Sequence, residues 1–481
     1  MHRFVEVVPI ALTPLTPIHI GCGEDFEPTN YVIDDGVLYY FEPTRLSLTD
    51  IDRERLIKEA NRKADEAIRA IQKFFYEKRR ACREASRLAV PVAAGVTEWY
   101  EGRVGRVAQR EAGGRTVSNQ LEIERTAHHP HTGKPYLPGS SLKGSMRTGW
   151  LNDLDKGPPV RRTPDQGPRE SSVKVEADLL GGDFKSDPFR LINVSDAASR
   201  DVQSRVVFAV DRRKQPRHDR SGGRVEAKDL FVRREAICGG QIRVLQGEIR
   251  FKSLPASVPP QDVPAPGKRI SDFATLARAC NRFYRSRLEA DLEVLAALGE
   301  VQWTSAFQSL IAALKPALEE GNMMLLRVGR HSGAESVTLD RHRWIRIMEG
   351  RGRAHWARDA TTIWLAADRT DSSSDLRPFG WLLIERADNL LPNDPLNRWC
   401  DQEMHAFARS PSSGAIRPSS AVPSSTGAQP EQAVRGPLRR EDKVIYQGEP
   451  AIIREIDGTE ARIEFEGGDT EWVPLDKLTR S

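Results

Sequence analysis

The stretch Pro135-Tyr-Leu-Pro-Gly-Ser-Ser-Leu-Lys-Gly-Ser-Met-Arg-Thr-Gly-Trp150 joins a short extended segment to a predicted helix. Apolar residues recur at every fourth position of it, as on one helix face: Leu142, Met146 and Trp150. Ser140 or Ser141 is a natural N-cap for that helix. A helix start offers unpaired backbone amides and partial positive charge, so we expect it to attract an anion.

The same stretch carries two cations that suit a phosphate group. Lys143 and Arg147 are four residues apart and therefore lie on one helix face, while Gly139 and Gly144 let a ligand approach the backbone. The nucleotide-triphosphate P-loop needs another spacing, because here the lysine precedes the glycine. The alternative is a capped helix whose Lys and Arg are simply solvated.

A second basic glycine stretch follows later, in Met324–Leu339. A predicted strand ends in a run of glycines and possible donors: Arg327, Gly329, Arg330, His331, Ser332 and Gly333. Glycines permit a tight approach of the backbone, and the arginines add charge. We expect a helix to begin at Ser332 or Ala334.

The N-terminal part is predicted to be β-rich. Residues 4–13 form a strand, and Ile18–Gly23 ends in a glycine turn that contains His19 and Gly21. Residues 31–41 are the clearest hairpin of the chain, because two β-rich runs flank Asp35-Gly36, a pair that suits a type I′ turn.

The remaining periodicity divides the chain into three parts. Residues 1–408 are predicted to form the main body, with helical inserts near 50–90 and 270–318. The helical periodicity of the second insert ends just before Pro316. Residues 409–436 are rich in Ser, Pro, Ala and Gly and predict a disordered linker. Residues 437–481 contain four short strands and turn signals, which indicate a small SH3-like or Tudor-like barrel.

The charge distribution and the cysteine content indicate what kind of protein this is. The 481 residues carry a net charge of +4, but residues 437–481 hold seven Lys/Arg and eleven Asp/Glu, so the body is basic. Such a body fits a polyanion partner, and the acidic module favours a protein contact. The five cysteines are dispersed, and no signal peptide or long apolar run is present, so we expect a cytoplasmic protein without disulfides or a membrane anchor.

No catalytic motif is recognisable. His128, His129 and His131 invite a metal interpretation, but Pro130 makes their convergence on one ion awkward, and a polar loop is the preferred interpretation. His19 and Asp25 form only an isolated acid–base pair. We therefore predict no cofactor, no metal and no catalytic residue.

Three stretches resemble the RAMP superfamily of CRISPR effector subunits: Ile18–Gly23, Tyr136–Arg147 and Leu326–Gly333. The resemblance spans roughly residues 1–400, and the run Ile20–Tyr39 is most similar to the fifth Csm subunit family of type III-A complexes. It implies an α+β fold with a ferredoxin-like, RRM-type core. It also implies partners, namely crRNA, target RNA and other RAMP-type subunits, and a non-catalytic role at the 3′ end of the guide that supports its maturation in antiviral defence.

On this basis the predicted RNA contacts are His19, Gly21, Gly139, Ser140, Ser141, Lys143, Gly144, Arg147, Arg327, Gly329, Arg330, His331, Ser332 and Gly333. Two alternatives stay open. One is a metal-dependent ribonuclease that uses Asp25, Asp34 or Asp35, although the last two are typical turn residues. The other is a protein-interaction adaptor that acts through the terminal barrel.

Overall fold

The fold is described from a computed structural model of the 481-residue chain. The described residues are 4–110, 116–118, 121–161, 172–182, 185–215, 217–218, 224–225, 230–348, 354–390, 392–409, 443–446, 449–457, 460–465, 470–474 and 479–480. The chain divides into two compact units, Met1–Ile416 and Arg417–Ser481, and each is described by itself. The predicted linker lies outside the described residues apart from Arg409, which ends a helix.

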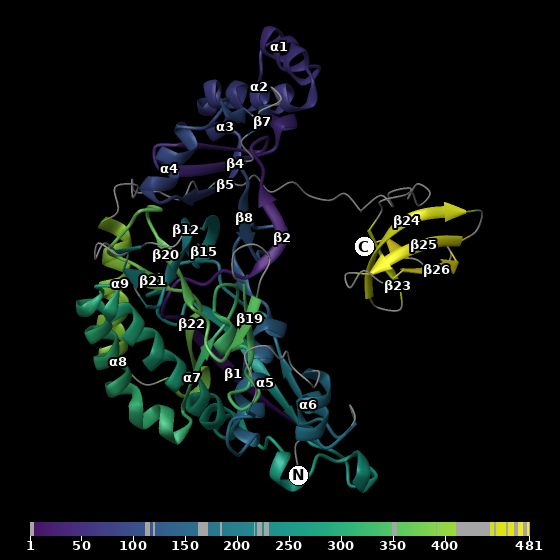
Figure 1. Ribbon diagram of the computed structural model, residues 1–481, viewed down its shortest axis with the longest axis vertical. Helices are drawn as coiled ribbons and strands as arrows, with labels where there is room; N and C mark the ends of the chain where they lie inside the picture. Colours follow the sequence, from purple (N-terminus) through teal and green to yellow (C-terminus); the bar gives the residue numbers. More distant parts are fainter. Residues whose placement is uncertain are drawn as a thin grey trace. The chain divides into compact units, whose positions relative to one another are not determined.

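A seven-stranded antiparallel sheet forms the base of the first unit (Figure 1). Its order is β17 (Met323–Arg327), β22 (Trp381–Arg386), β1 (Val5–Pro14), β16 (Leu245–Lys252), β11 (Ala197–Ala198) and β9 (Tyr136–Leu137), with β10 (Ile192–Val194) also paired to β16. The predicted first strand is therefore a central strand. Its apolar residues Val8, Ile10 and Leu12 are fully buried, which places them in the main core.

A second, six-stranded sheet contains the N-terminal glycines, and the turn predicted there is wrong, because Gly21-Cys22-Gly23 begins a strand that pairs with β8 (Ile123–Thr126). Its order is β2 (Gly21–Phe26), β8 (Ile123–Thr126), β15 (Phe231–Ile237), β12 (Ser204–Arg213), β20 (Thr362–Ala367) and β21 (Arg377–Pro378). Alternate residues of β12 face opposite sides of the sheet. Val206, Phe208 and Val210 belong to the main core. Val207 and Ala209 instead join a separate small cluster with Ala236, Ala366 and Phe379.

A third sheet and several helices form one end of the first unit (Figure 1). They are β3 (Tyr31–Asp34), β4 (Val37–Phe41), β5 (Ser86–Pro91), α1 (Asp50–Ala60), α2 (Ala64–Glu77), α3 (Arg79–Glu84) and α4 (Ala94–Glu101). The hairpin turn has φ of 49° at Asp35 and 72° at Gly36, as a type I′ turn requires. The predicted helical insert is too long, because residues 86–91 pair with β4 as a strand.

Further helices pack on the large sheet and on one another: α5 (Gly139–Leu154), α6 (Ser172–Leu180), α7 (Phe273–Ala297), α8 (Val301–Glu320) and α9 (Asp394–Arg409). Contacts join α7 to α5, α8 and β17. The expected end of the second helical insert before Pro316 is wrong, since α8 continues to Glu320 and buries Leu318. That burial compensates for the hydrogen bond which the proline removes. No helix in the described ranges is long and apolar enough to cross a membrane.

Three isolated hairpins complete the first unit: β6 (Val107–Arg110) with β7 (Thr116–Ser118), β13 (Arg217–His218) with β14 (Arg224–Val225), and β18 (Ile345–Met348) with β19 (Ala354–Ala357). The second unit is a five-stranded antiparallel sheet of β23 (Lys443–Tyr446), β24 (Glu449–Asp457), β25 (Glu460–Phe465), β26 (Thr470–Pro474) and β27 (Thr479–Arg480). The mixed helix and strand content agrees with the predicted α+β class. The ferredoxin-like arrangement of the core and the barrel form of the second unit stay predictions.

Candidate nucleic-acid interface

The start of α5 differs from the predicted N-cap. The helix begins at Gly139, the cap position is taken by Pro138 in an extended conformation, and no side chain caps the helix. Ser140 and Ser141 therefore lie inside the first turn, so their assignment as N-caps is wrong. The reason is local, because the proline carbonyl accepts from the amides of Ser141 (3.0 Å) and Leu142 (3.2 Å) and so fixes the start.

An acidic side chain already occupies the anion position at this helix start. The amide of Gly139 donates to Oδ1 of Asp196 at 2.7 Å. A Cβ on Gly139 would lie 2.2 Å from the carbonyl oxygen of Val194, so glycine is required for this close packing. The first amide of α5 is thus bound within the protein. Ser140 and Gly144 are exposed on the surface.

The two cations of α5 have different surroundings. Nε of Arg147 lies 3.0 Å from Glu176, and its Nη1 lies 2.7 Å from Asp187. Lys143 forms no ion pair or hydrogen bond with the described residues, and burial lowers its pKa. Of the pair, Lys143 is the cation whose charge is left for a ligand.

The N-terminal glycine segment and the second basic stretch meet in space. The amide of Arg330 donates to the carbonyl of His19 at 2.8 Å. Gly329 has a φ of 83°, and a Cβ there would lie 2.4 Å from the same carbonyl oxygen. Glycine is therefore needed at position 329, both for its conformation and for the close approach of two segments more than 300 residues apart.

Glu124 of β8 is the centre of this contact. Its carboxylate forms ion pairs with Arg330 and Arg234, and its Oε1 lies 3.6 Å from Nε2 of His19. A Cβ on Gly21 would lie 3.0 Å from the same oxygen. The His19 ring and the two guanidinium groups lower the pKa of Glu124 to about 2. Sequence reasoning missed Glu124, because Glu122 and Glu124 look alike in a predicted strand and only the fold brings the cations to one of them.

His331 is held as a neutral ring beside this cluster. Its backbone is left-handed, with φ of 68°, and its ring centroid lies 4.7 Å from that of Trp364 and 5.2 Å from that of Phe379. Nε of Arg234 donates to Nε2 of His331 at 3.2 Å. Burial and the nearby Arg234 lower the pKa of His331 to about 3, so we expect the ring to be uncharged at neutral pH.

Two predicted contacts of the second stretch are buried. Arg327 is 4% exposed, and its Nη1 lies 2.8 Å from Asp291 of α7. Ser332 is 5% exposed, whereas Gly333 is exposed. The predicted helix after this stretch is a single 3-10 turn at Ala334–Ser336. The hydroxyl of Ser145 donates to the carbonyl of Arg327 at 3.0 Å, so α5 lies directly against the end of β17.

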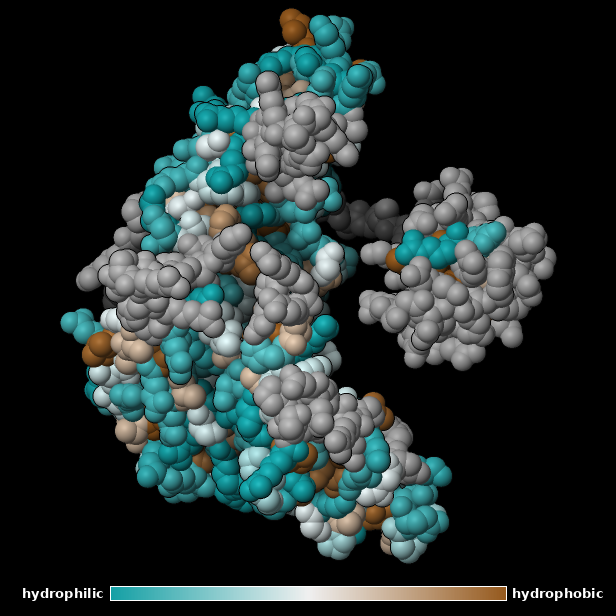
Figure 2. All heavy atoms as spheres, viewed as in Figure 1, coloured by the Kyte–Doolittle hydropathy of each residue, from teal (hydrophilic) through white to brown (hydrophobic). Residues whose placement is uncertain are grey.

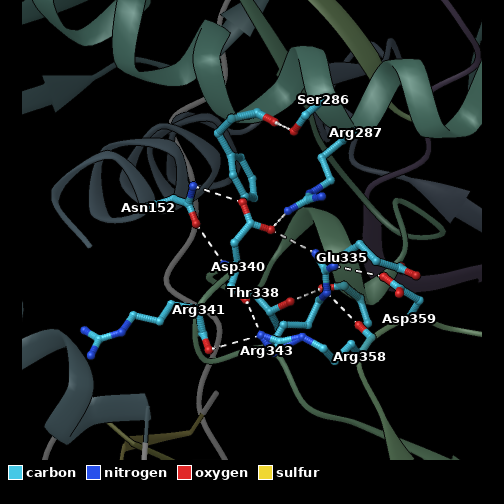
Figure 3. Close-up of polar contacts among 12 residues, drawn as sticks. Asn152, Ser286, Arg287, Glu335, Thr338, Asp340, Arg341, Arg343, Arg358 and Asp359 are labelled. Carbon is cyan, nitrogen blue, oxygen red and sulfur yellow. Dashed lines mark hydrogen bonds and ion pairs between the residues drawn. The ribbon is translucent and has the colours of Figure 1, made fainter. Parts of the chain in front are cut away.

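The segment that follows is fixed to α5 and α7 by the polar contacts in Figure 3. Asp340 forms ion pairs with Arg287 of α7 and with Arg343, the latter at 3.0 Å. Nδ2 of Asn152 of α5 donates to Oδ2 of Asp340 at 3.2 Å. These contacts fix the segment before the β18–β19 hairpin to α5 and α7.

The exposed part of this region is polar. The Arg330 side chain is 57% exposed, although one of its nitrogens contacts Glu124. On the face seen in Figure 2, hydrophilic residues predominate among the described ones, and apolar residues form separate small spots. A hydrophilic, partly cationic surface suits a polar ligand more than an apolar one.

The residues of the ribonuclease alternative do not converge. Asp34 lies 3.1 Å from Nε of Arg79 and 3.9 Å from Nη1 of Arg83, and Asp35 is a turn residue. Asp25 lies on β2, opposite Glu124. Within the described residues no group of three or more His, Cys, Asp and Glu is placed to hold a metal ion, and this includes the three histidines at 128, 129 and 131.

Comparison with known proteins defines the class. The sequence model of the RAMP superfamily matches residues 11–262, just over half of the chain. The chain therefore belongs to the RAMP superfamily.

Within that class the chain is similar to Csm5. The "CRISPR system Cms protein Csm5" of Streptococcus thermophilus is 24% identical over 243 residues, which cover 47% of this chain and 60% of the relative. The protein of the same name from Methanocaldococcus jannaschii is 21% identical over 287 residues, which cover 58% and 62%. The chain thus spans about three-fifths of the length of these curated relatives.

Two solved structures are distantly similar. A chain in the cryo-EM structure of a Csm–crRNA–target RNA ternary complex of a type III-A CRISPR-Cas system has a TM-score of 0.44 and 16% identity, covering 79% of this chain and 100% of that chain. The crystal structure of T. onnurineus Csm5 has a TM-score of 0.40 and 15% identity, covering 77% and 99%.

Proposed function

We propose that this protein is a non-catalytic, guide-RNA-binding subunit of a type III CRISPR effector complex. The observation that supports the proposal most is the convergence of the three sequence stretches that carry the RAMP resemblance. The glycine segment at His19 and Gly21 lies against Arg330, and Ser145 of α5 binds the carbonyl of Arg327. Segments far apart in the sequence thus contact one another.

Lys143 and Arg330, one from each of the two later stretches, are the phosphate ligands of the proposal. Lys143 forms no ion pair or hydrogen bond within the described residues, and the Arg330 side chain is 57% exposed. Arg147, Arg327 and Ser332 are not among the proposed ligands, because the first is doubly ion-paired and the other two are buried. Binding through phosphates is salt-dependent and independent of sequence.

The exposed hydroxyl of Ser140 and the exposed backbone of Gly144 complete the proposed contact. A serine hydroxyl next to a phosphate ligand can pair with a ribose 2′-hydroxyl, which is how proteins distinguish RNA from DNA. The names of the Csm5 relatives associate them with a CRISPR system, and this supports crRNA, target RNA and other RAMP-type subunits as partners. Within such a complex we assign the chain to the 3′ end of the guide, where it caps the RNA and supports its maturation.

The test is a pull-down of the tagged protein from its native cells, with sequencing of the RNA that co-purifies. We expect short RNAs with a common repeat-derived 5′ end and lengths that differ at the 3′ end, together with other RAMP-type proteins. A matched culture that carries the Lys143→Ala, Arg330→Ala double variant should recover much less of this RNA. RNA of no common origin in the wild-type sample would refute the proposal.

A further inference from the structure

A cavity of about 580 Å³ lies on the second sheet, beside the loop 368–377. Its floor, on the sheet side, is lined by small and apolar residues, Val207, Ala236, Cys238, Gly239 and Ala366, and by Ile237, whose side chain belongs to the main core on the other face. Val207, Ala236 and Ala366 belong to the side of the sheet that faces away from the main core. Small side chains on a pleated sheet leave a flat, apolar surface, on which a planar ring can lie.

The rim of the cavity is charged but balanced. Three arginines and three acidic residues line it: Arg205, Arg369, Arg377, Asp368, Asp375 and Glu403. Arg205 lies 3.0 Å from Asp368, and Arg377 lies 3.3 Å from Glu403. A guanidinium has five donors and a carboxylate has several acceptor sites, so such pairs keep hydrogen-bonding capacity. A neutral rim with both donors and acceptors suits the polar edge of a nucleobase better than it suits a phosphate.

The loop that forms the outer wall is fixed in place. Nη2 of Arg212 donates to the carbonyl of Thr370 at 2.7 Å, and the amide of Leu376 donates to Glu300 at 3.0 Å. Asp375 holds a left-handed backbone, with φ of 59°. The cavity therefore exists before any ligand binds, which lowers the entropic cost of binding.

The cavity shares its sheet face with the proposed RNA contact. Ala236 is two residues after Arg234 on β15, so the two side chains face the same side and their Cα atoms are about 7 Å apart. Val207 is paired with Arg234 across the sheet. Arg234 in turn binds Glu124, the carboxylate that also contacts Arg330. The cavity and Arg330 are thus connected within the protein through Arg234 and Glu124.

From this geometry we propose that the cavity binds one unstacked nucleotide of single-stranded RNA, with its base on the small-residue floor and its polar edge against the charged rim. The inference rests on the proposed function and adds a site for a base to the phosphate contacts at Lys143 and Arg330.

The test compares two neighbouring serines of the loop. Ser374 lines the cavity, whereas Ser373 is exposed and does not line it. The full-length wild type, Ser374→Trp and Ser373→Trp are titrated with a labelled single-stranded oligoribonucleotide of about 12 nucleotides. We expect Ser374→Trp to weaken binding about tenfold, since lost stacking of one base costs on the order of 1–3 kcal/mol. Ser373→Trp should bind within about twofold of the wild type, and thermal unfolding of each variant shows that it is folded.

Cross-linking gives a second measurement that needs no variant. Oligoribonucleotides with 4-thiouridine at successive positions should cross-link to residues 366–377 at one position only, and this cross-link should be absent in Ser374→Trp. Cross-links elsewhere in the protein, with equal affinity of both serine variants, would overturn the cavity proposal. If Arg330→Ala still weakens RNA binding in that case, the proposed function stands and only the cavity proposal fails.

Two other results are informative. A wild-type protein that binds no RNA would overturn both proposals together. Loss of a protein partner from the native complex in Ser374→Trp, with unchanged RNA affinity, would overturn the nucleotide assignment in favour of a peptide ligand.

Discussion

The two basic glycine stretches, 139–147 and 327–333, both combine glycines with arginine or lysine, but their cations have different surroundings in the fold. In each, one cation is fixed by ion pairs or burial, and the other is the better candidate for a ligand, although Arg330 also pairs with Glu124. Arg147 is paired with Glu176 and Asp187, while Lys143 forms no ion pair or hydrogen bond among the described residues. Arg327 is buried against Asp291, while the Arg330 side chain is 57% exposed.

The comparison shows that a short basic motif does not by itself identify a ligand site, because some of its cations bind to other parts of the protein. Within each motif only one of the two cations extends from the protein, and the other ties the motif to a neighbouring helix. Substitutions at the two kinds of cation should therefore have opposite profiles, one affecting stability and the other RNA affinity.

The largest effect is expected for Arg327→Ala. Removing one partner of a buried ion pair leaves Asp291 charged and unpaired, which costs about 3–5 kcal/mol of unfolding free energy. Arg147→Ala removes a half-buried, partly solvated cation and should cost only about 1 kcal/mol. Urea unfolding of the two variants measures the difference. Equal losses of unfolding free energy in the two variants would contradict the stronger contribution of Arg327.

The second effect is a pH dependence of folding stability that arises from His331 in the stretch 327–333. The folded protein holds the pKa of His331 at about 3, below the ordinary value of 6.5. Between these values the unfolded chain binds a proton that the folded protein does not, so stability falls as the pH drops from about 6.5 towards 3. Glu124, with its pKa lowered to about 2 from 4.5, adds a loss in the same direction at lower pH.

His331→Asn removes the titrating group that acts between pH 6.5 and about 3, and asparagine tolerates the left-handed backbone at this position. Chemical unfolding at pH 7, 5.5 and 4.5 should show a shallower fall of stability in this variant than in the wild type. An unchanged slope between pH 7 and 4.5 would contradict the assignment of a neutral, buried ring.

The third prediction compares one glycine from each stretch. Gly329→Ala should destabilise the protein by about 2 kcal/mol or more, because of its φ of 83° and the clash with the carbonyl of His19. Gly144→Ala lies in a helix and meets nothing within 4 Å, so it should stabilise by up to about 1 kcal/mol. If RNA approaches α5 closely, Gly144→Ala should nevertheless weaken RNA binding. Thermal unfolding and RNA titration of both variants distinguish these effects.

The sequence predicts those elements whose signals are local. Strand β1, the hairpin at Asp35-Gly36 and the four strands expected in residues 437–481 follow from alternation and turn residues, and the structure has them. The helix after Pro138 is also local in origin, although its cap is not the predicted serine. These elements need no knowledge of distant partners.

The partners of each charge depend on the fold and could not be predicted. Nothing in the sequence around Arg147 indicates Asp187, and nothing near Arg330 indicates Glu124, because these pairs join separate elements. For the same reason the sequence predicts helix in a region where 86–91 forms a strand, since the pairing with β4 determines its conformation. Which cations are fixed within the protein and which stay accessible to a ligand is thus a property of the tertiary structure.

The central claim is that Lys143 and Arg330 contact RNA, whereas Arg147 does not. The most direct measurement is the affinity for a single-stranded oligoribonucleotide as a function of salt concentration, for the Lys143→Ala, Arg330→Ala double variant, for Arg147→Ala and for the wild type. Each lost phosphate contact should reduce the slope of log affinity against log salt by about 0.7, so we expect the double variant to bind weakly with a slope lower by about 1.4 and Arg147→Ala to follow the wild type. Wild-type affinity and slope in the double variant would contradict the account.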